Sequence, residues 1–224
     1  MIPWVRLDAV KLEDGPELRL MQRGTEFSIM LGANELMNSR LSGSEEALAR
    51  LAAERLQGRD APRMLIGGLG MGFTLRAALA SLGAGARVTV AELVPEVIAW
   101  ARGPMAQVFG GCLDDSRVSL VQADVGKLIA DGAGAWDAIL LDVDNGPEGL
   151  TRTGNDALYS AQGLAAGFRA LKPGGVFSVW SSAPDPAFTR RLRQAGFDVS
   201  EVAVRASTKK RGARHMIWVA VRPG

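Results

Sequence analysis

The sequence predicts an α/β fold in which a mostly parallel, seven-stranded sheet with an antiparallel last strand follows a small N-terminal β-meander. Two patterns predict it. From Arg63 onward, short apolar segments alternate with segments of helical spacing, which is typical of a parallel sheet covered by helices on both faces. At the end of the chain, two strand-like segments at 197–204 and 215–221 follow each other with only a polar loop between them. An antiparallel pair of strands therefore closes the sheet.

Taken in order, the elements divide the chain into two predicted domains. Residues 1–43 form the β-meander, because short alternating runs are broken by turn sequences such as Asp14-Gly15-Pro16. Residues 44–224 form the nucleotide-binding domain, which begins with a helix whose plausible capping box pairs Ser42 with Glu45. The strands that follow are predicted at 63–68, 86–91, 117–121, 136–142 and 175–181, and the helices at 73–82, 94–102, 125–131, 157–171 and 186–195.

Composition excludes several classes of protein. The formal net charge is only +2, so nucleic-acid binding over the whole surface is not expected. One cysteine and one histidine cannot make an internal disulfide or a zinc cluster, and no metal site is expected. No stretch of roughly twenty residues lacks charged side chains, and the N-terminus does not read as a secretory signal. We therefore expect a cytoplasmic protein without a membrane helix.

A glycine-rich loop joins the first strand of the main domain to the next helix. Residues 64–72 run from an apolar strand into glycines at alternate positions, Gly68, Gly70 and Gly72. The dinucleotide fingerprint Gly-x-Gly-x-x-Gly fails, because the sixth position from Gly68 is Phe73. The spacing that remains is typical of sites for S-adenosylmethionine-type nucleotides, and the alternative is a turn needed only for tight packing of strand against helix.

Acidic residues end three successive strands at the edge of the sheet where α/β proteins bind ligands. Glu92 can accept both ribose hydroxyls, Asp124 can bond an adenine amino group, and Asp142 ends the fourth strand. Each of them alone also suits a turn or a helix N-cap. The predicted nucleotide-binding residues are Gly68, Gly70, Gly72, Glu92, Leu93, Asp124, Val125 and Asp142.

From Met64 to about Val179, the sequence resembles the spermidine synthase family, the polyamine aminopropyltransferases. These enzymes share the class I methyltransferase fold and bind decarboxylated S-adenosylmethionine. The segments that carry the resemblance are Gly68 to Gly72 with Leu75-Arg76, Glu92 to Ile98, Gln122-Ala-Asp124, Leu141 to Pro147 and Arg169 to Gly175. The resemblance implies that Glu92 holds the ribose, that Asp124 holds the adenine, and that Asp142 is the catalytic aspartate. It also implies a possible homodimer formed through the β-meander.

The sequence departs from the family's pattern around the polyamine. Met71 stands where the family has aspartate in the glycine loop, and Asn145 takes the second position of the Asp-x-x-Asp loop, beside Asp144. Trp180 replaces a common glutamine. The tyrosine and histidine that begin the family's first helix are missing, since that helix here starts at Ser44. Only Asp142, Asp144, and Glu45 or Glu46, could supply the carboxylates that a cationic polyamine needs. The nucleotide-binding set is thus intact while the polyamine-binding set is not.

Three functions follow from this contrast. The main expectation is methyl transfer from S-adenosylmethionine to a small nucleophile, with Asp142 orienting or deprotonating the acceptor and with Asp144 and Asn145 beside it. The first alternative is aminopropyl transfer from decarboxylated S-adenosylmethionine to a diamine, and the second is a catalytically silent nucleoside-binding protein. Tyr159 and Trp180 are the predicted substrate-binding wall, and a basic loop at 207–215 is a weaker candidate for substrate contact.

Overall fold

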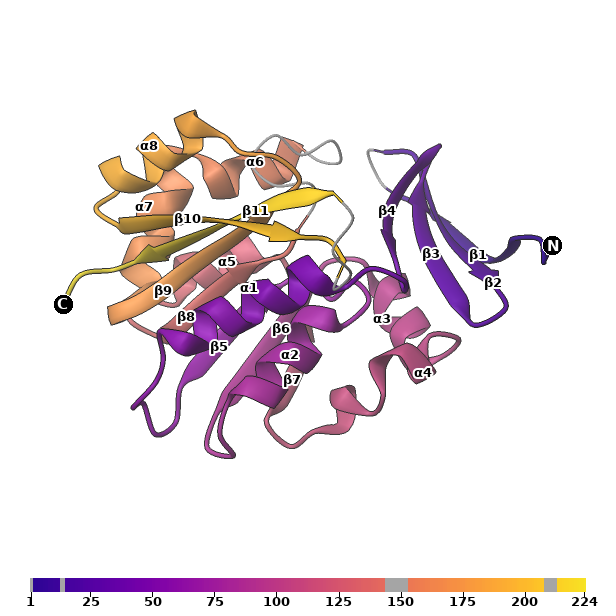
Figure 1. The fold of residues 1–224 in the computed structure, drawn as a ribbon, viewed down its shortest axis with the longest axis horizontal. Coiled ribbons are helices and arrows are strands. Elements are labelled where there is room, and N and C mark those ends of the chain that lie inside the picture. Colours follow the sequence, from indigo (N-terminus) through magenta and orange to yellow (C-terminus); the bar gives the residue numbers. More distant parts are fainter. Residues whose placement is uncertain (1, 13–14, 144–152, 208–212) are drawn as a thin grey trace.

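The chain folds around two β-sheets that lie side by side (Figure 1). The computed structural model describes residues 2–12, 15–143, 153–207 and 213–224. In these ranges the first sheet is antiparallel and has the strand order β1-β2-β3-β4. The second sheet has seven strands in the order β10-β11-β9-β8-β5-β6-β7. The strands are β1 (Val5–Lys11), β2 (Glu17–Arg23), β3 (Glu26–Leu31), β4 (Asn34–Asn38), β5 (Arg63–Gly67), β6 (Arg87–Glu92), β7 (Val118–Gln122), β8 (Trp136–Leu141), β9 (Leu171–Ser181), β10 (Asp198–Arg205) and β11 (Arg214–Val221).

The seven-stranded sheet has the predicted direction of strands. Strands β9, β8, β5, β6 and β7 run parallel, whereas β11 pairs antiparallel with both β9 and β10. This arrangement confirms the predicted fold class. The helices are α1 (Gly43–Glu54), α2 (Phe73–Ser81), α3 (Pro95–Arg102), α4 (Ala106–Phe109), α5 (Val125–Asp131), α6 (Thr153–Tyr159), α7 (Ala161–Ala170) and α8 (Pro186–Gln194), with a 3-10 turn at Cys112–Asp114.

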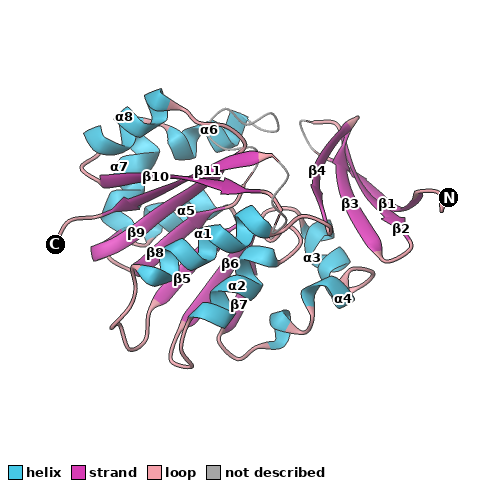
Figure 2. Ribbon diagram, viewed as in Figure 1, coloured by secondary structure: helices cyan, strands magenta, loops and turns pink. Residues whose placement is uncertain are grey.

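Helices cover both faces of this sheet, so its strands are apolar on both sides (Figure 2). Successive side chains of β5 point to opposite faces of the sheet. Met64 and Ile66 pack in one hydrophobic cluster, and Leu65 packs in the other. The first cluster also takes side chains from α1, α2 and α3, and the second takes them from α5, α7 and α8. Burial of these two faces holds the carboxyl ends of the parallel strands in fixed positions.

Three local predictions were wrong. The helix predicted at 157–171 is divided into α6 and α7, because the Ser160 hydroxyl accepts a hydrogen bond from Gly163 N at 3.1 Å and begins a new helix. The short helix α4 and the following 3-10 turn were not expected. The capping box does not form either, since Ser42 makes no side-chain hydrogen bond at the start of α1. The Glu45 side chain is therefore not held in a capping box at the start of α1.

The small sheet packs one apolar face toward the main sheet, near the loop after β5. Leu18, Ile29 and Leu31 from this face are buried in the same cluster as the α1 and α2 side chains. A hydrogen bond of 2.7 Å from Trp100 Nε1 of α3 to the Asp8 carboxylate of β1 adds a polar link. The division into domains after residue 43 and the homodimer through the small sheet stay predictions. No helix in the described ranges is long and apolar enough to cross a membrane.

Candidate active site

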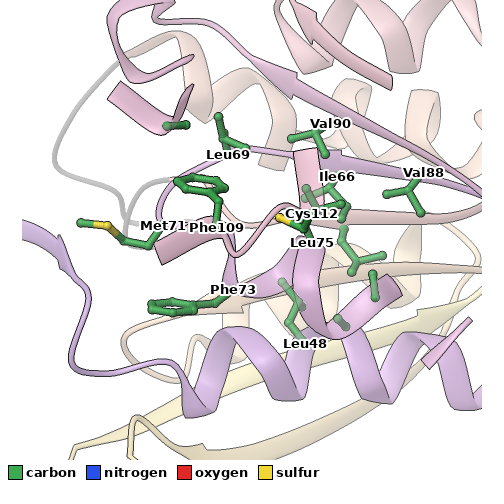
Figure 3. Packing of buried hydrophobic residues seen from close by; sticks show 14 of the residues in the cluster. Leu48, Ile66, Leu69, Met71, Phe73, Leu75, Val88, Val90, Phe109 and Cys112 are labelled. Carbon is green, nitrogen blue, oxygen red and sulfur yellow. The ribbon is translucent and has the colours of Figure 1, made fainter. Parts of the chain in front are cut away.

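The glycine loop is held tightly between its neighbours. Gly68 has a φ angle of 90°, and a Cβ atom there would lie 2.4 Å from the Asp142 carbonyl oxygen. Gly72, with a φ angle of 75°, begins α2, and a Cβ atom there would lie 2.5 Å from the Phe109 ring. Figure 3 shows Phe109 and Met71 near this loop. Glycine is therefore required at both positions by backbone conformation and by space.

A cavity of about 140 Å³ lies between this loop and the apolar face of the small sheet. We call it the loop cavity. Its main-domain lining comes from the glycine loop and from the carboxyl ends of β6, β7 and β8, while β2, β3 and β4 line the opposite side. The residues are Leu12, Leu18, Ile29, Leu31, Leu36, Met37, Gly68, Gly70, Ala91, Glu92, Leu93, Val94, Val97, Ala123, Asp124, Val125, Asp142 and Val143. All predicted nucleotide-binding residues except Gly72 are among them.

Two carboxylates of the loop cavity also organise its backbone. Glu92 accepts hydrogen bonds from Leu69 N at 3.0 Å and from Val94 N at 2.9 Å, so it ties the glycine loop to the end of β6. Asp124 caps α5 by accepting a hydrogen bond from Gly126 N at 2.8 Å. Each carboxylate retains acceptor capacity, because a carboxylate oxygen has two lone pairs. Asp124 therefore caps α5 and lines the loop cavity at the same time.

A second cavity of about 100 Å³ adjoins the first, and we call it the acid cavity. It shares Leu36, Met37, Gly70 and Asp142 with the loop cavity. Its own residues come from α1, the glycine loop, α2 and β9. They are Glu45, Leu69, Met71, Gly72, Phe73 and Trp180. Asp142 is thus the acidic residue that the two cavities have in common.

The Asp142 carboxylate lies in an unfavourable electrostatic environment. It accepts one hydrogen bond, from the Thr74 hydroxyl of α2 at 2.6 Å. Burial, and after it the negative charge of Glu45, raise the pKa of Asp142 to about 7, although the Thr74 hydrogen bond acts in the opposite direction. A carboxyl group with a pKa near neutrality is well suited to accept and release a proton.

Glu45 connects the acid cavity to the last strand of the sheet. Its carboxylate lies 2.6 Å from the Ser44 hydroxyl, which in turn lies 2.9 Å from His215 Nδ1 of β11. Ser44 is fully buried, and the His215 ring packs edge-on against Trp180 with 4.7 Å between the ring centroids. Burial raises the pKa of Glu45 and lowers that of His215. Sequence reasoning considered Glu45 for a capping box and as a candidate carboxylate for a polyamine, and it placed His215 at a strand end. The separation from 45 to 215 gave no signal that Ser44 connects them.

The two cavities are lined by carboxylates without opposing cations. Their described linings include Glu45, Glu92, Asp124 and Asp142 but no lysine, arginine or histidine side chain. Such a lining disfavours phosphates and other anions and favours a ligand with positive charge. Together, the cavities can hold a cation and place a carboxylate of raised pKa against it.

The structure brings together only part of the predicted acceptor site. Trp180 lines the acid cavity, but Tyr159 is buried among core side chains, with its ring 5.6 Å from that of Phe188 and its hydroxyl donating to the Val143 carbonyl at 3.4 Å. Tyr159 lines neither cavity as described. Asp144 and Asn145 lie outside the described residues, as does most of the basic loop at 207–215.

The order of the strands, the glycine loop and the acidic strand ends define a class I methyltransferase-like fold with a cavity at the carboxyl ends of its parallel strands. Two solved structures share this fold with the chain. Spermidine synthase from Thermotoga maritima matches 97% of this chain and 72% of its own, with a TM-score of 0.77 and 21% identity. A spermidine synthase in complex with the transition state analogue AdoDATO matches the same shares, with a TM-score of 0.76 and 20% identity.

Sequence comparison leads to the same family. The polyamine aminopropyltransferase of Mycobacterium tuberculosis is 34% identical to the chain over 155 residues, which are 65% of this chain and 28% of that relative. The chain thus aligns with less than a third of the relative's length, and no family model matches it. In sequence and in fold, the chain is spermidine synthase-like, as the resemblance predicted. The comparisons support the aminopropyl alternative and give no support to the main expectation of methyl transfer.

Proposed function

We propose that this chain transfers the aminopropyl group of decarboxylated S-adenosylmethionine to a primary amine. The observation that carries the proposal is the position of Asp142, which lines the loop cavity and the acid cavity at once. A donor in one cavity and an acceptor in the other would meet at this carboxylate. The similarity to polyamine aminopropyltransferases supports this pair of substrates.

The loop cavity suits the nucleoside part of the donor. Glu92 would accept the ribose hydroxyls and Asp124 the adenine amino group, while Leu18, Ile29 and Leu31 supply an apolar cover. The positive sulfonium would lie toward Asp142, where the described lining of the two cavities supplies no cation. S-adenosylmethionine itself carries an additional carboxylate, which Asp142 and Glu45 would repel. The charge of the site therefore favours the decarboxylated donor.

The acid cavity suits the amine, which reaches the enzyme as an ammonium ion. Asp142 would accept one proton from it, and the neutral nitrogen would then attack the methylene carbon next to the sulfonium sulfur. A carbon–nitrogen bond forms as the carbon–sulfur bond breaks, and its electron pair neutralises the sulfur as a thioether. Asp142 finally releases its proton to water. Because the sulfonium is already electrophilic, alignment and exclusion of water supply most of the catalysis.

The test is to incubate the purified protein with decarboxylated S-adenosylmethionine and putrescine and to measure products by mass spectrometry. We expect spermidine and methylthioadenosine in equal amounts, and no product when S-adenosylmethionine replaces the donor. An N-methylated amine formed from S-adenosylmethionine would overturn the proposal in favour of methyl transfer. Nucleoside binding without turnover of any diamine would overturn it in favour of a binding protein.

A further inference from the structure

Glu45 occupies an unusual position for a carboxylate near the start of a helix. It lines the acid cavity, opposite the glycine loop and together with Asp142, instead of capping α1. The Ser44 hydroxyl at 2.6 Å and His215 Nδ1 beyond it form a hydrogen-bonded row that ends at the Glu45 carboxylate. Two elements far apart in the sequence, α1 and β11, thus fix this one side chain.

Among the described residues that line the two cavities, the charges near this row are negative. Asp142 shares the cavity with Glu45, and Glu46 on the same helix also repels it. Glu92 and Asp124 line the adjoining loop cavity, and β11 carries His215 and the exposed Arg214. No lysine or arginine is among the described residues that line either cavity. Two neighbouring, partly buried carboxylates without a cation are costly, and an ammonium ion between them would reduce the cost.

We propose that Glu45 is the second carboxylate that binds the acceptor's ammonium group, and that His215, acting through Ser44, is a positioning residue that holds it there. This inference rests on the proposed function, because it assigns the acid cavity to the amine. A primary ammonium group has three N–H donors, so it can contact Asp142 and Glu45 at the same time. After Asp142 takes one proton, Glu45 keeps the amine in place for attack.

The direction of the hydrogen bonds explains how His215 and Ser44 keep Glu45 ionised. Burial lowers the pKa of His215, so its imidazole is neutral near pH 7. With its hydrogen on Nδ1, the ring donates to the Ser44 oxygen, and the Ser44 hydroxyl donates to Glu45. Both bonds then favour the ionised form of Glu45 against burial and the charge of Asp142. The row therefore maintains the charge that the ammonium group needs.

The test measures binding of putrescine by calorimetry, with methylthioadenosine present to fill the loop cavity. Glu45→Gln should weaken putrescine binding about 10- to 100-fold, because a buried charge-assisted hydrogen bond is lost. Glu46→Gln is the matched control, since Glu46 is the next residue and pairs with Arg50 at 3.9 Å, and it should bind within about twofold of wild type. His215→Gln and Ser44→Ala should fall between them. Methylthioadenosine binding and thermal unfolding confirm that each variant is folded.

A pH profile separates an electrostatic role of Glu45 from a structural one. Glu45→Gln removes a charge that raises the pKa of Asp142, so the acid limit of putrescine binding should move to lower pH while the maximum affinity falls. Wild-type affinity and an unmoved acid limit in Glu45→Gln would overturn this inference and leave the proposed function intact. A wild type that binds putrescine but transfers nothing would overturn the proposed function alone. A wild type that binds no amine would overturn both.

Discussion

Strand β8 has a buried carboxylate near its start and a partly buried one directly after its end, and the electrostatic surroundings of the two are opposite. Asp137 is 3% exposed and is paired with Arg59 and with Lys172, whose Nζ lies 2.7 Å away, while Arg63 N donates to it at 2.8 Å. Asp142 has one hydroxyl donor and a negative neighbour. Burial raises the pKa of Asp137, but its three partners together outweigh burial and lower it. Burial and Glu45 raise that of Asp142.

The difference separates a stabilising carboxylate from a reactive one. At the amino end of the strand, Asp137 connects β5, β8 and β9 and is neutralised inside the protein. At the carboxyl end, where α/β sheets bind ligands, no cation among the described residues pairs with Asp142. A cationic substrate would supply the missing partner. Removing the negative charge should therefore lower activity but not stability at Asp142, and stability but not activity at Asp137.

The largest effect is expected from Asp142→Asn. The amide keeps the shape of the side chain and its bond with Thr74 but cannot accept a proton, so aminopropyl transfer should fall about 1,000-fold or more. Methylthioadenosine affinity should stay within about threefold of wild type. The variant should be at least as stable as wild type at pH 8, because a buried, repelled charge is gone. Transfer at a tenth of the wild-type rate or faster would contradict the role given to Asp142.

The next effect is expected from Asp137→Asn, and it concerns stability. Without the negative charge, Arg59 and Lys172 lose their shared partner, and unfolding should become easier by about 2 kcal/mol, since both cations are partly exposed. Thermal unfolding should shift down by roughly 4–8 °C. The rate of transfer per folded molecule should not change. Asp198→Asn, at an exposed position of β10, is the control, and an equal shift in that variant would show that Asp137 has no special role.

Stability against pH should distinguish the two carboxylates by sign. Because the pKa of Asp142 rises from 3.8 to about 7 on folding, the native state holds a proton between these values that the unfolded chain has released. Its contribution to stability is therefore present at low pH and declines as pH rises from about 4 to 7, by at most about 1.4 kcal/mol per pH unit. Asp137, whose pKa is lowered, contributes stability above pH 3.8 that is lost as pH falls further.

Urea unfolding from pH 3 to pH 8 provides the measurement. The difference between Asp142→Asn and wild type should grow as pH rises from about 4 to 7, in favour of the variant, and level off above pH 7. The difference between Asp137→Asn and wild type should be constant above about pH 4 and shrink in acid. Parallel curves for Asp142→Asn and wild type would show that the two carboxyl groups of β8 are not electrostatically different.

Much of the fold could be predicted from the sequence because its signals are local. Apolar strands that alternate with helical spacing gave the parallel sheet, and two adjacent strands without a helix gave its antiparallel edge. The break between α6 and α7 was missed because Ser160 forms a cap inside a run that otherwise has helical spacing. Local patterns also identified Glu92 and Asp124 as candidates, because both lie at or just beyond the carboxyl ends of strands.

The acid cavity could not be predicted because its parts come from distant segments. Glu45, Asp142 and Trp180 are brought together by the packing of α1 against the carboxyl ends of β8 and β9. The sequence around Ser42 and Glu45 fits a capping box equally well, and only the fold shows that the carboxylate faces a cavity. The sequence left open whether Tyr159 lies in the core or faces a ligand, since a buried and a ligand-facing aromatic ring have the same local pattern.

The smallest effect in the comparison concerns Thr74, the hydroxyl donor that distinguishes Asp142 from a carboxylate with no partner at all. This hydrogen bond lowers the pKa of Asp142 against burial and Glu45. Thr74→Val keeps the volume of the buried side chain and removes the donor, so the pKa should rise further and the acid limit of transfer should move to higher pH. At pH 7, transfer should fall about three- to tenfold, as expected for the loss of one hydrogen bond to a charged group. Thr74→Ser, which retains the hydroxyl, should keep the wild-type acid limit. If the valine and serine variants shared one pH profile, packing rather than the hydrogen bond would be the contribution of Thr74.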